Sequence, residues 1–191
     1  MIEEKEFKKG LINRLNTINP GWIDGDRDNT QNKKVDIVNH SLKIAIEIKD
    51  DTRYKIEIPA SGVIVSGGED LDKMNKRFTD HLRSANNKFK EYSNYKTILL
   101  IRTEFPIVDI IRYSIDGLHQ YGINSQSRSL VYKGRKSKYS EFIRKEIGCY
   151  LIFNNEDHFF FPNSFTNEKR VLNKIEIEKM FGLEFQDIPQ I

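Results

Sequence analysis

Two carboxylates and one lysine lie among apolar residues in the stretch "KKVDIVNHSLKIAIEIKDD", which runs from Lys33 to Asp51. Asp36 falls on a first short apolar segment, and Glu47 and Lys49 alternate with isoleucines on a second. Alternate residues of a β-strand share a face, so Glu47 and Lys49 are expected on one face and the isoleucines on the other. If the two segments pair antiparallel through a tight turn, Asp36 lies close to Glu47.

Two neighbouring carboxylates repel each other unless a cation lies between them. Mg²⁺ takes such oxygen ligands and keeps water in its other positions, and the carbonyl oxygen of Ile48 offers a further ligand. Lys49 is placed to orient or deprotonate a water, or to hold a phosphate oxygen. A Lewis acid, an activated water and a nearby cation are what phosphodiester hydrolysis requires. An ordinary edge strand with cross-paired Glu and Lys gives the same pattern, so this alternative stays open.

A further carboxylate falls on the predicted first helix, residues 3–16. Phe7, Leu11 and Leu15 recur at four-residue spacing and define its apolar stripe. At 3.6 residues per turn, Glu4 falls in the centre of that stripe, where it would point toward a metal at the strand ends. The alternative is an acid in the first turn that interacts favourably with the helix N-terminus.

Hydrophobic periodicity places the elements around these residues. After the first helix, the Pro- and Gly-containing residues 19–29 are predicted to form a loop. The predicted elements that follow are a strand hairpin at 33–38 and 43–49, an extended segment at 54–68, a helix at 71–92 and a buried strand at 96–103. This order predicts an α/β protein with helices packed on a sheet.

The second half of the chain has less regular patterning. Its predicted elements are a helix at 106–122, a strand at 128–134, a helix at 137–148, a hairpin at 149–153 and 158–162, and a closing helix at 173–183. A local basic patch is formed by Lys133, Arg135, Lys136 and Lys138. It is either a solvated connection or a contact for a phosphate backbone.

Asp36, ten intervening residues and then Glu47-Ile48-Lys49 resemble the signature of the PD-(D/E)XK nuclease superfamily, which includes restriction endonucleases and Holliday junction resolvases. The predicted order of elements in residues 3–103 is similar to the superfamily's core of helix, three-strand meander, helix and strand. The resemblance implies a restriction endonuclease-like fold, with a mixed central sheet flanked by helices. It also implies that Asp36, Glu47 and Glu4 bind metal and that Lys49 is catalytic.

The resemblance covers residues 1–105, so 106–191 are expected to form an α+β extension packed on the same domain. It implies a Mg²⁺-dependent endonuclease that acts on DNA and in which Mn²⁺ can replace Mg²⁺. Such enzymes include homodimers, so a homodimer is one expected state of the protein. Two features depart from the family: Val35 stands where the signature has proline, and the long helix has no Gln-x-x-x-Tyr. The helix residues that could face the site are Asn75, His81, Asn86 and Lys88.

Composition agrees with a single folded domain. The chain has 191 residues, 38% of them hydrophobic, and a net charge of +3, which permits a polyanionic partner. No run approaches the ~20 apolar residues of a membrane span, and the acidic N-terminus is unlike a signal peptide, so a cytoplasmic location is expected. Cys149 is the only cysteine and is expected to be a buried apolar residue.

Other site classes fit less well. Asp24, Asp26 and Asp28 alternate as in a calcium loop, but Asn29 and Val35 stand where that loop needs glycine and glutamate. There is no phosphate-binding loop, no zinc spacing among the histidines and no Gly-x-Ser-x-Gly. The main rival is a nucleic-acid-binding or assembly protein of the same fold without catalysis.

Overall fold

The fold is known from a computed structural model that describes residues 3–50, 68–103, 121–123, 130–132, 145–154, 158–161 and 169–187. Helices are α1 (Glu4–Ile18), α2 (Gly68–Phe89) and α5 (Lys174–Phe181), with short 3₁₀ turns η1 (Gly25–Arg27) and η2 (Lys90–Tyr92). The strands are β1 (Trp22–Asp24), β2 (Ile37–Asn39), β3 (Ile44–Asp50), β4 (Lys96–Thr103), β5 (Tyr121–Ile123), β6 (Leu130–Tyr132), β7 (Cys149–Asn154), β8 (His158–Phe161) and β9 (Gln186–Asp187).

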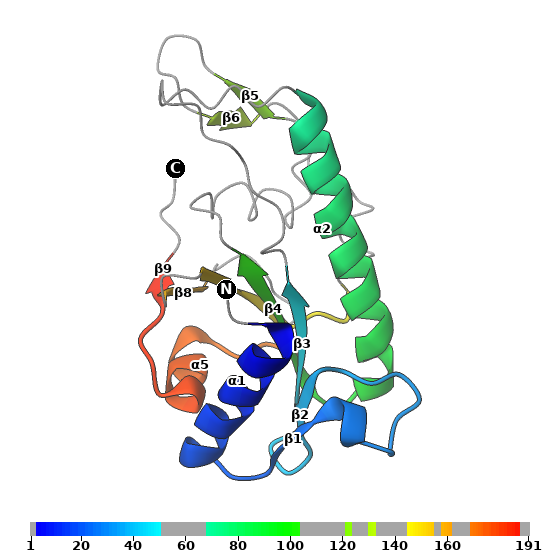
Figure 1. The fold of residues 1–191 in the computed structure, drawn as a ribbon, viewed down its shortest axis with the longest axis vertical. Helices are drawn as coiled ribbons and strands as arrows, with labels where there is room; N and C mark the ends of the chain where they lie inside the picture. The colour runs from blue at the N-terminus through cyan, green and yellow to red at the C-terminus, as the bar shows by residue number, and fades with distance from the viewer. Residues whose placement is uncertain are drawn as a thin grey trace.

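Seven strands form one mixed sheet in the order β1-β2-β3-β4-β7-β8-β9 (Figure 1). The central strands β3, β4 and β7 are parallel, while β1 and β2 join antiparallel on one side and β8 is antiparallel to β7 on the other. A separate antiparallel pair is formed by β5 and β6. The chain is therefore an α/β protein, and strands after residue 106 extend the same sheet as β1–β4.

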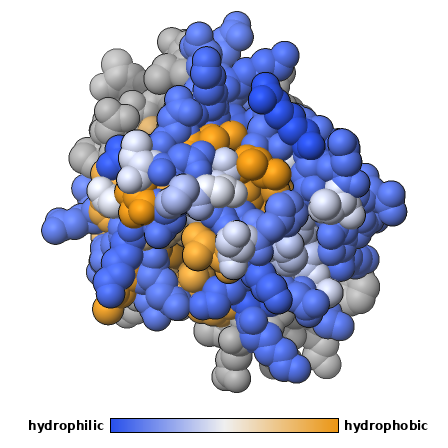
Figure 2. Space-filling model, turned by 90° about the horizontal axis from the view of Figure 1, so that it is seen from below, coloured by the Kyte–Doolittle hydropathy of each residue, from blue (hydrophilic) through white to orange (hydrophobic). Residues whose placement is uncertain are grey.

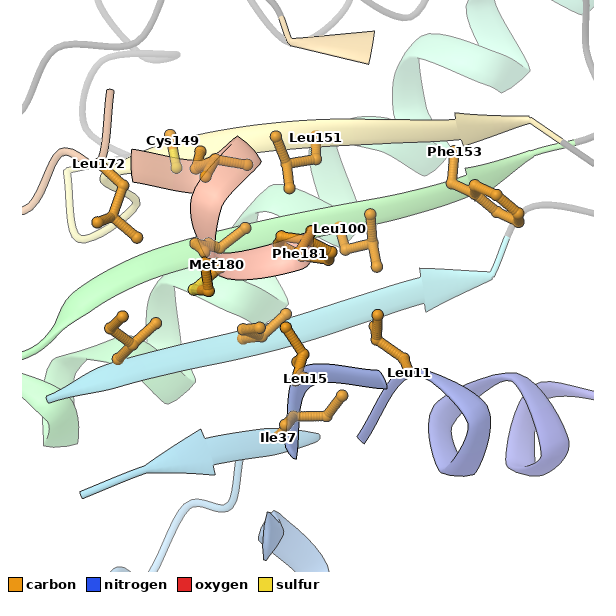
Figure 3. Close-up of a cluster of buried hydrophobic side chains, with 14 of the residues drawn as sticks. Leu11, Leu15, Ile37, Leu100, Cys149, Leu151, Phe153, Leu172, Met180 and Phe181 are labelled. Atoms are coloured by element: carbon orange, nitrogen blue, oxygen red, sulfur yellow. The ribbon is translucent and has the colours of Figure 1, made fainter. Parts of the chain in front are cut away.

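Helices cover both faces of this sheet because its strands carry apolar residues on both sides. On one face, α2 packs through Phe78, Leu82, Ala85 and Phe89 against a cluster that includes Ala45 and Leu99. The other face is covered by α1 and α5. Figure 3 shows this second cluster, in which side chains from both helices meet those of the strands; the labelled members are Leu11, Leu15, Ile37, Leu100, Cys149, Leu151, Phe153, Leu172, Met180 and Phe181.

Most predicted elements are confirmed. The first helix, the hairpin of β2 and β3, the long helix, β4, β6, the hairpin of β7 and β8, and the closing helix all form. The closing helix begins at a capping box of Asn173 and Glu176 and ends at Gly182, whose φ of 63° is left-handed. Cys149 is buried, as predicted, and burial raises the pKa of its thiol to about 12.

Three predictions are corrected or fall outside the described residues. Residues 19–29 are not only a loop, because β1 and η1 lie within them. β1 pairs with β2 and so forms an antiparallel meander with β2 and β3. The last two residues of the helix predicted at 106–122 are in a strand instead, since β5 begins at Tyr121. Residues 54–67, 106–120 and 137–144 and the basic patch at 133–138 lie outside the described residues.

The backbone of η1 passes very close to the backbone of residues 35–36 at Gly25. The Gly25 N–H donates to the Asp36 carbonyl at 2.9 Å, and a Cβ at Gly25 would lie 1.8 Å from the Val35 carbonyl oxygen. We therefore expect Gly25→Ala to destabilise the fold by roughly 1–3 kcal/mol or more, because the backbone must move.

Gly10→Ala in α1 is the matched control for this change. A Cβ there meets nothing within 4 Å, so this change should stabilise by about 0.5–1 kcal/mol. Urea unfolding measures the free energy of unfolding of both variants. Equal changes in Gly25→Ala and Gly10→Ala would contradict the close packing at Gly25.

In the part of the chain that the structure describes, no helix has the length and apolar content to cross a bilayer. Seen from below, hydrophobic residues appear as separate groups among hydrophilic ones (Figure 2). The exposed large hydrophobic side chains of the described residues are Ile18, Ile23, Leu42 and Ile175.

Candidate functional site

The β2–β3 hairpin brings the two predicted carboxylates together. Ile37 pairs with Ile46 in the antiparallel register, and one further step along both strands sets Asp36 opposite Glu47. Directly opposite residues of an antiparallel pair share a face. Ala45 belongs to the core cluster on the α2 face, so Glu47 and Asp36 lie on that face, while Ile44, Ile46 and Ile48 pack on the other. The predicted alternation is confirmed.

Asp36 is fixed by the backbone of β3. Its Oδ2 accepts a hydrogen bond of 2.7 Å from the Ile48 N–H. This bond continues the β2–β3 pairing beyond the end of β2 by means of a side chain. Since the N–H and C=O of one strand residue point to the same side, the Ile48 carbonyl oxygen also lies on the Asp36 side of β3. This carbonyl oxygen is the one that was named from the sequence as a further ligand for Mg²⁺.

Glu47 is the most unusual group of the site because it is a carboxylate with 0% exposure. Two lysines contact it. Lys49 Nζ lies 2.7 Å from Oε1, and Lys88 Nζ from α2 lies 2.7 Å from Oε1 and 2.9 Å from Oε2. Burial and repulsion from Asp36 nevertheless raise the pKa of Glu47, although both lysines act in the opposite direction. A cation is therefore a favourable neighbour at this position.

The helix α2 contributes two residues that lie four positions apart. Ser84 Oγ accepts a hydrogen bond of 3.2 Å from Lys49 Nζ, and Lys88 spans both oxygens of Glu47. Residues at this spacing share one side of a helix. Of the four helix residues considered from the sequence, Lys88 is the one seen at the site. Asn86 instead accepts from the Glu146 N–H at 2.8 Å and His81 packs on Phe78, while the side chain of Asn75 is outside the described residues.

The residues present fit a hard divalent cation in part. Two carboxylates and one backbone carbonyl are within the same small region, and Mg²⁺ is usually bound by one or two carboxylates with water completing its shell. Glu4 is exposed in the first turn of α1. Within the described ranges, no three acidic, histidine or cysteine side chains are arranged to hold a metal, so Glu4 does not join Asp36 and Glu47 as the predicted third carboxylate.

The opposite face of β3 carries a second buried ion pair. Arg102 is 1% exposed, and its guanidinium donates to Asp50 Oδ2 at 3.0 Å. The same guanidinium lies 5.0 Å from the centre of the Phe7 ring. Because Asp50 and Arg102 are paired across the parallel β3–β4 ladder, this contact joins the carboxyl ends of both strands to α1. It holds in position the strand end that carries Glu47 and Lys49.

The three aspartates of the η1 region are engaged by protein groups. Asp24 and Asp26 bind Lys8 Nζ at 2.7 and 2.9 Å. Asp28, which is buried, accepts from the Thr30 N–H and hydroxyl and lies 3.3 Å from His40 Nε2. They are separate from the Asp36–Glu47 pair, and their contacts anchor the loop that precedes β2.

Comparisons with protein-family models, with curated proteins and with solved structures found no match to this chain.

Proposed function

We propose that this protein is a metal-dependent deoxyribonuclease that hydrolyses phosphodiester bonds at Asp36, Glu47 and Lys49. One observation carries the proposal: Glu47 is fully buried beside Asp36 and is contacted by two lysine ammonium groups. A structural edge strand does not require a buried carboxylate opposite a second carboxylate, because that arrangement costs desolvation and repulsion. Strained electrostatics of this kind are concentrated at functional sites.

The position in the fold also supports a site. Glu47 is the middle residue of β3, Lys49 lies near the carboxyl end of that strand, and β3 is parallel to β4. In open α/β sheets, ligands bind beyond the carboxyl ends of parallel strands. The element order α1-β1-β2-β3-α2-β4 is the helix, meander, helix and strand expected of a restriction endonuclease-like core, which we propose as the fold.

The charges of the site suit a phosphodiester. Asp36 and Glu47 carry two negative charges, which the two positive charges of Lys49 and Lys88 balance. A divalent cation would then add two positive charges to a neutral site. They would balance the charge of the phosphodiester and that of an attacking hydroxide. Electrostatic stabilisation of this type is usually the largest contribution to catalysis.

Each residue then has a defined role. Asp36, Glu47 and the Ile48 carbonyl would hold the Mg²⁺, for which Mn²⁺ can substitute. When bound, the metal supplies Lewis-acid polarisation of a phosphoryl oxygen and lowers the pKa of water. Lys49, oriented by Glu47 and Ser84, places its ammonium group where it can orient the attacking water and stabilise charge on the phosphate. Lys88 balances the charge of Glu47 and contacts both of the carboxylate oxygens that a cation would use.

A cleavage panel tests this function. Supercoiled plasmid, linear duplex, single-stranded DNA and a four-way junction are incubated with the protein in Mg²⁺, in Mn²⁺ and in EDTA. We expect cutting of at least one substrate in either metal and none in EDTA, because the Lewis acid is required. The preferred substrate identifies the branch of nuclease. An absence of cutting on every substrate, together with no binding of metal, would contradict the proposal.

A further inference from the structure

A groove lies between α1 and β1, with a volume of about 670 Å³. Its apolar lining comes from Ile12, Trp22 and Ile23. Around these residues the lining is charged, with four cations, Lys5, Lys8, Lys9 and Arg27, and two anions, Asp24 and Asp26. The lining therefore carries a net charge of +2, while the whole chain carries +3.

The cations of the groove are of two kinds. Lys8 is engaged by both Asp24 and Asp26, which raise its pKa despite partial burial. Lys5, Lys9 and Arg27 are exposed, and within the described part of the chain no hydrogen bond or ion pair joins them to another side chain. Arg27 does attract the Asp24 carboxylate and so helps to lower the pKa of Asp24. Lys5 and Lys9 are four positions apart, so they lie on the same side of α1. Three positive groups are thus available to an outside anion.

The groove lies at the β1 edge of the sheet on the face covered by α1, whereas the side chains of Asp36 and Glu47 lie on the face covered by α2. The η1 wall of the groove is bonded to the chain at Asp36, since the Gly25 N–H donates to the Asp36 carbonyl at 2.9 Å. The N-terminal half of α1 lies near the carboxyl ends of the central strands, where Phe7 stacks on Phe153 of β7 with the ring centres 5.1 Å apart. An extended ligand that passes around the β1 edge of the sheet could therefore contact both the groove and the Asp36–Glu47 site.

We infer that Lys5, Lys9 and Arg27 bind the phosphate backbone of the nucleic acid and direct it to Asp36 and Glu47. This inference rests on the proposed function for the identity of the ligand. An extended polyanion is favoured over a small one because the cations are spread over two elements, α1 and η1. A groove with low-dielectric apolar walls also strengthens the attraction of its cations for an anion. Contacts of this kind fix position and register and carry no sequence preference.

The test compares two triple variants that remove the same charge. The groove variant is Lys5→Gln, Lys9→Gln and Arg27→Gln. The control variant is Lys43→Gln, Lys90→Gln and Lys179→Gln, which changes exposed lysines in the β2–β3 turn, in η2 and on α5. Binding of a fluorescein-labelled duplex in EDTA is followed by anisotropy from 50 to 200 mM salt. Thermal unfolding shows whether both variants are folded.

We expect the groove variant to bind at least about tenfold more weakly at 50 mM salt. Its salt slope should fall by up to about 2.7, from three contacts at about 0.9 each. The control variant should retain most of the affinity and the slope. Equal binding by the two variants, or no DNA binding by the unaltered protein, would overturn the inference.

These outcomes are separable from those of the proposed function. If the unaltered protein cleaves DNA and the groove variant binds normally, the nuclease stands and the groove assignment fails. If the groove variant loses binding while the unaltered protein never cleaves, the groove stands and the nuclease fails.

Discussion

Replacing Glu47 with glutamine should reduce metal-dependent cleavage by at least about a thousandfold while the protein stays folded. Glutamine has the same shape but lacks the negative charge that would hold the cation, and charge stabilisation of the transition state is lost with it. Lys49 and Lys88 also lose their shared anionic partner, because the Nζ atom of each lysine lies 2.7 Å from Glu47 Oε1. DNA binding should persist, since removing a negative charge favours the approach of a phosphate.

A surface glutamate provides the control for this change. Glu176 also contacts a lysine, Lys96, at 3.1 Å, but its side chain is 42% exposed and lies on α5. Glu176→Gln keeps an amide at the third position of the capping box, where glutamine is accepted. Its cleavage rate should equal that of the unaltered protein. Normal cleavage by Glu47→Gln, with Glu176→Gln also active, would show that Glu47 is not a ligand of the catalytic metal.

The two lysines on Glu47 should respond differently to replacement by methionine, which keeps much of the side-chain length. Lys49→Met should slow single-turnover cleavage by about 10²–10³-fold, the effect of removing one group that stabilises charge in the transition state, without weakening metal binding. Lys88→Met should tighten metal binding, because Lys88 contacts both oxygens that the cation needs. Calorimetric titration with Mn²⁺ measures affinity, and rapid-quench assays at saturating metal measure the rate.

The opposite pattern would reassign the lysines. If Lys88→Met weakened metal binding as strongly as Glu47→Gln, Lys88 would act by holding Glu47 in place rather than by occupying the position of the cation. If Lys49→Met lost metal affinity and kept its rate at saturating metal, the role of Lys49 would be structural.

The centre of the site could be predicted from the sequence because local rules determine it. A short turn between two apolar segments imposes antiparallel pairing, and the two-residue period then places Asp36 and Glu47 on one face. The apolar stripe of the long helix likewise predicted that α2 packs on the sheet, as Phe78, Leu82 and Phe89 do.

Other parts depend on contacts between segments that are distant in the sequence. Lys88 and three other helix residues flanked the apolar stripe equally well, and only the packing of α2 against β3 brings Lys88 to Glu47. Ser84 was missed because a small polar residue on a helix gives no signal of its own. The strand β1 has only three residues among glycine, proline and aspartate, and it forms by pairing with β2. The prediction for Glu4 rested on helix phase and on the family resemblance, and helix phase becomes unreliable at an exposed first turn.

Binding of Mn²⁺, followed by the loss of its free-ion signal in electron paramagnetic resonance, tests the central claim most directly. The unaltered protein should bind Mn²⁺ with an affinity that Glu47→Gln and Asp36→Asn each reduce at least tenfold and that Glu176→Gln leaves unchanged. Mn²⁺ should also raise the melting temperature of the unaltered protein and not that of Glu47→Gln, since a ligand that binds the native state stabilises it. Equal Mn²⁺ binding by the unaltered protein and Glu47→Gln, or no binding by either, would contradict a metal site at Asp36 and Glu47.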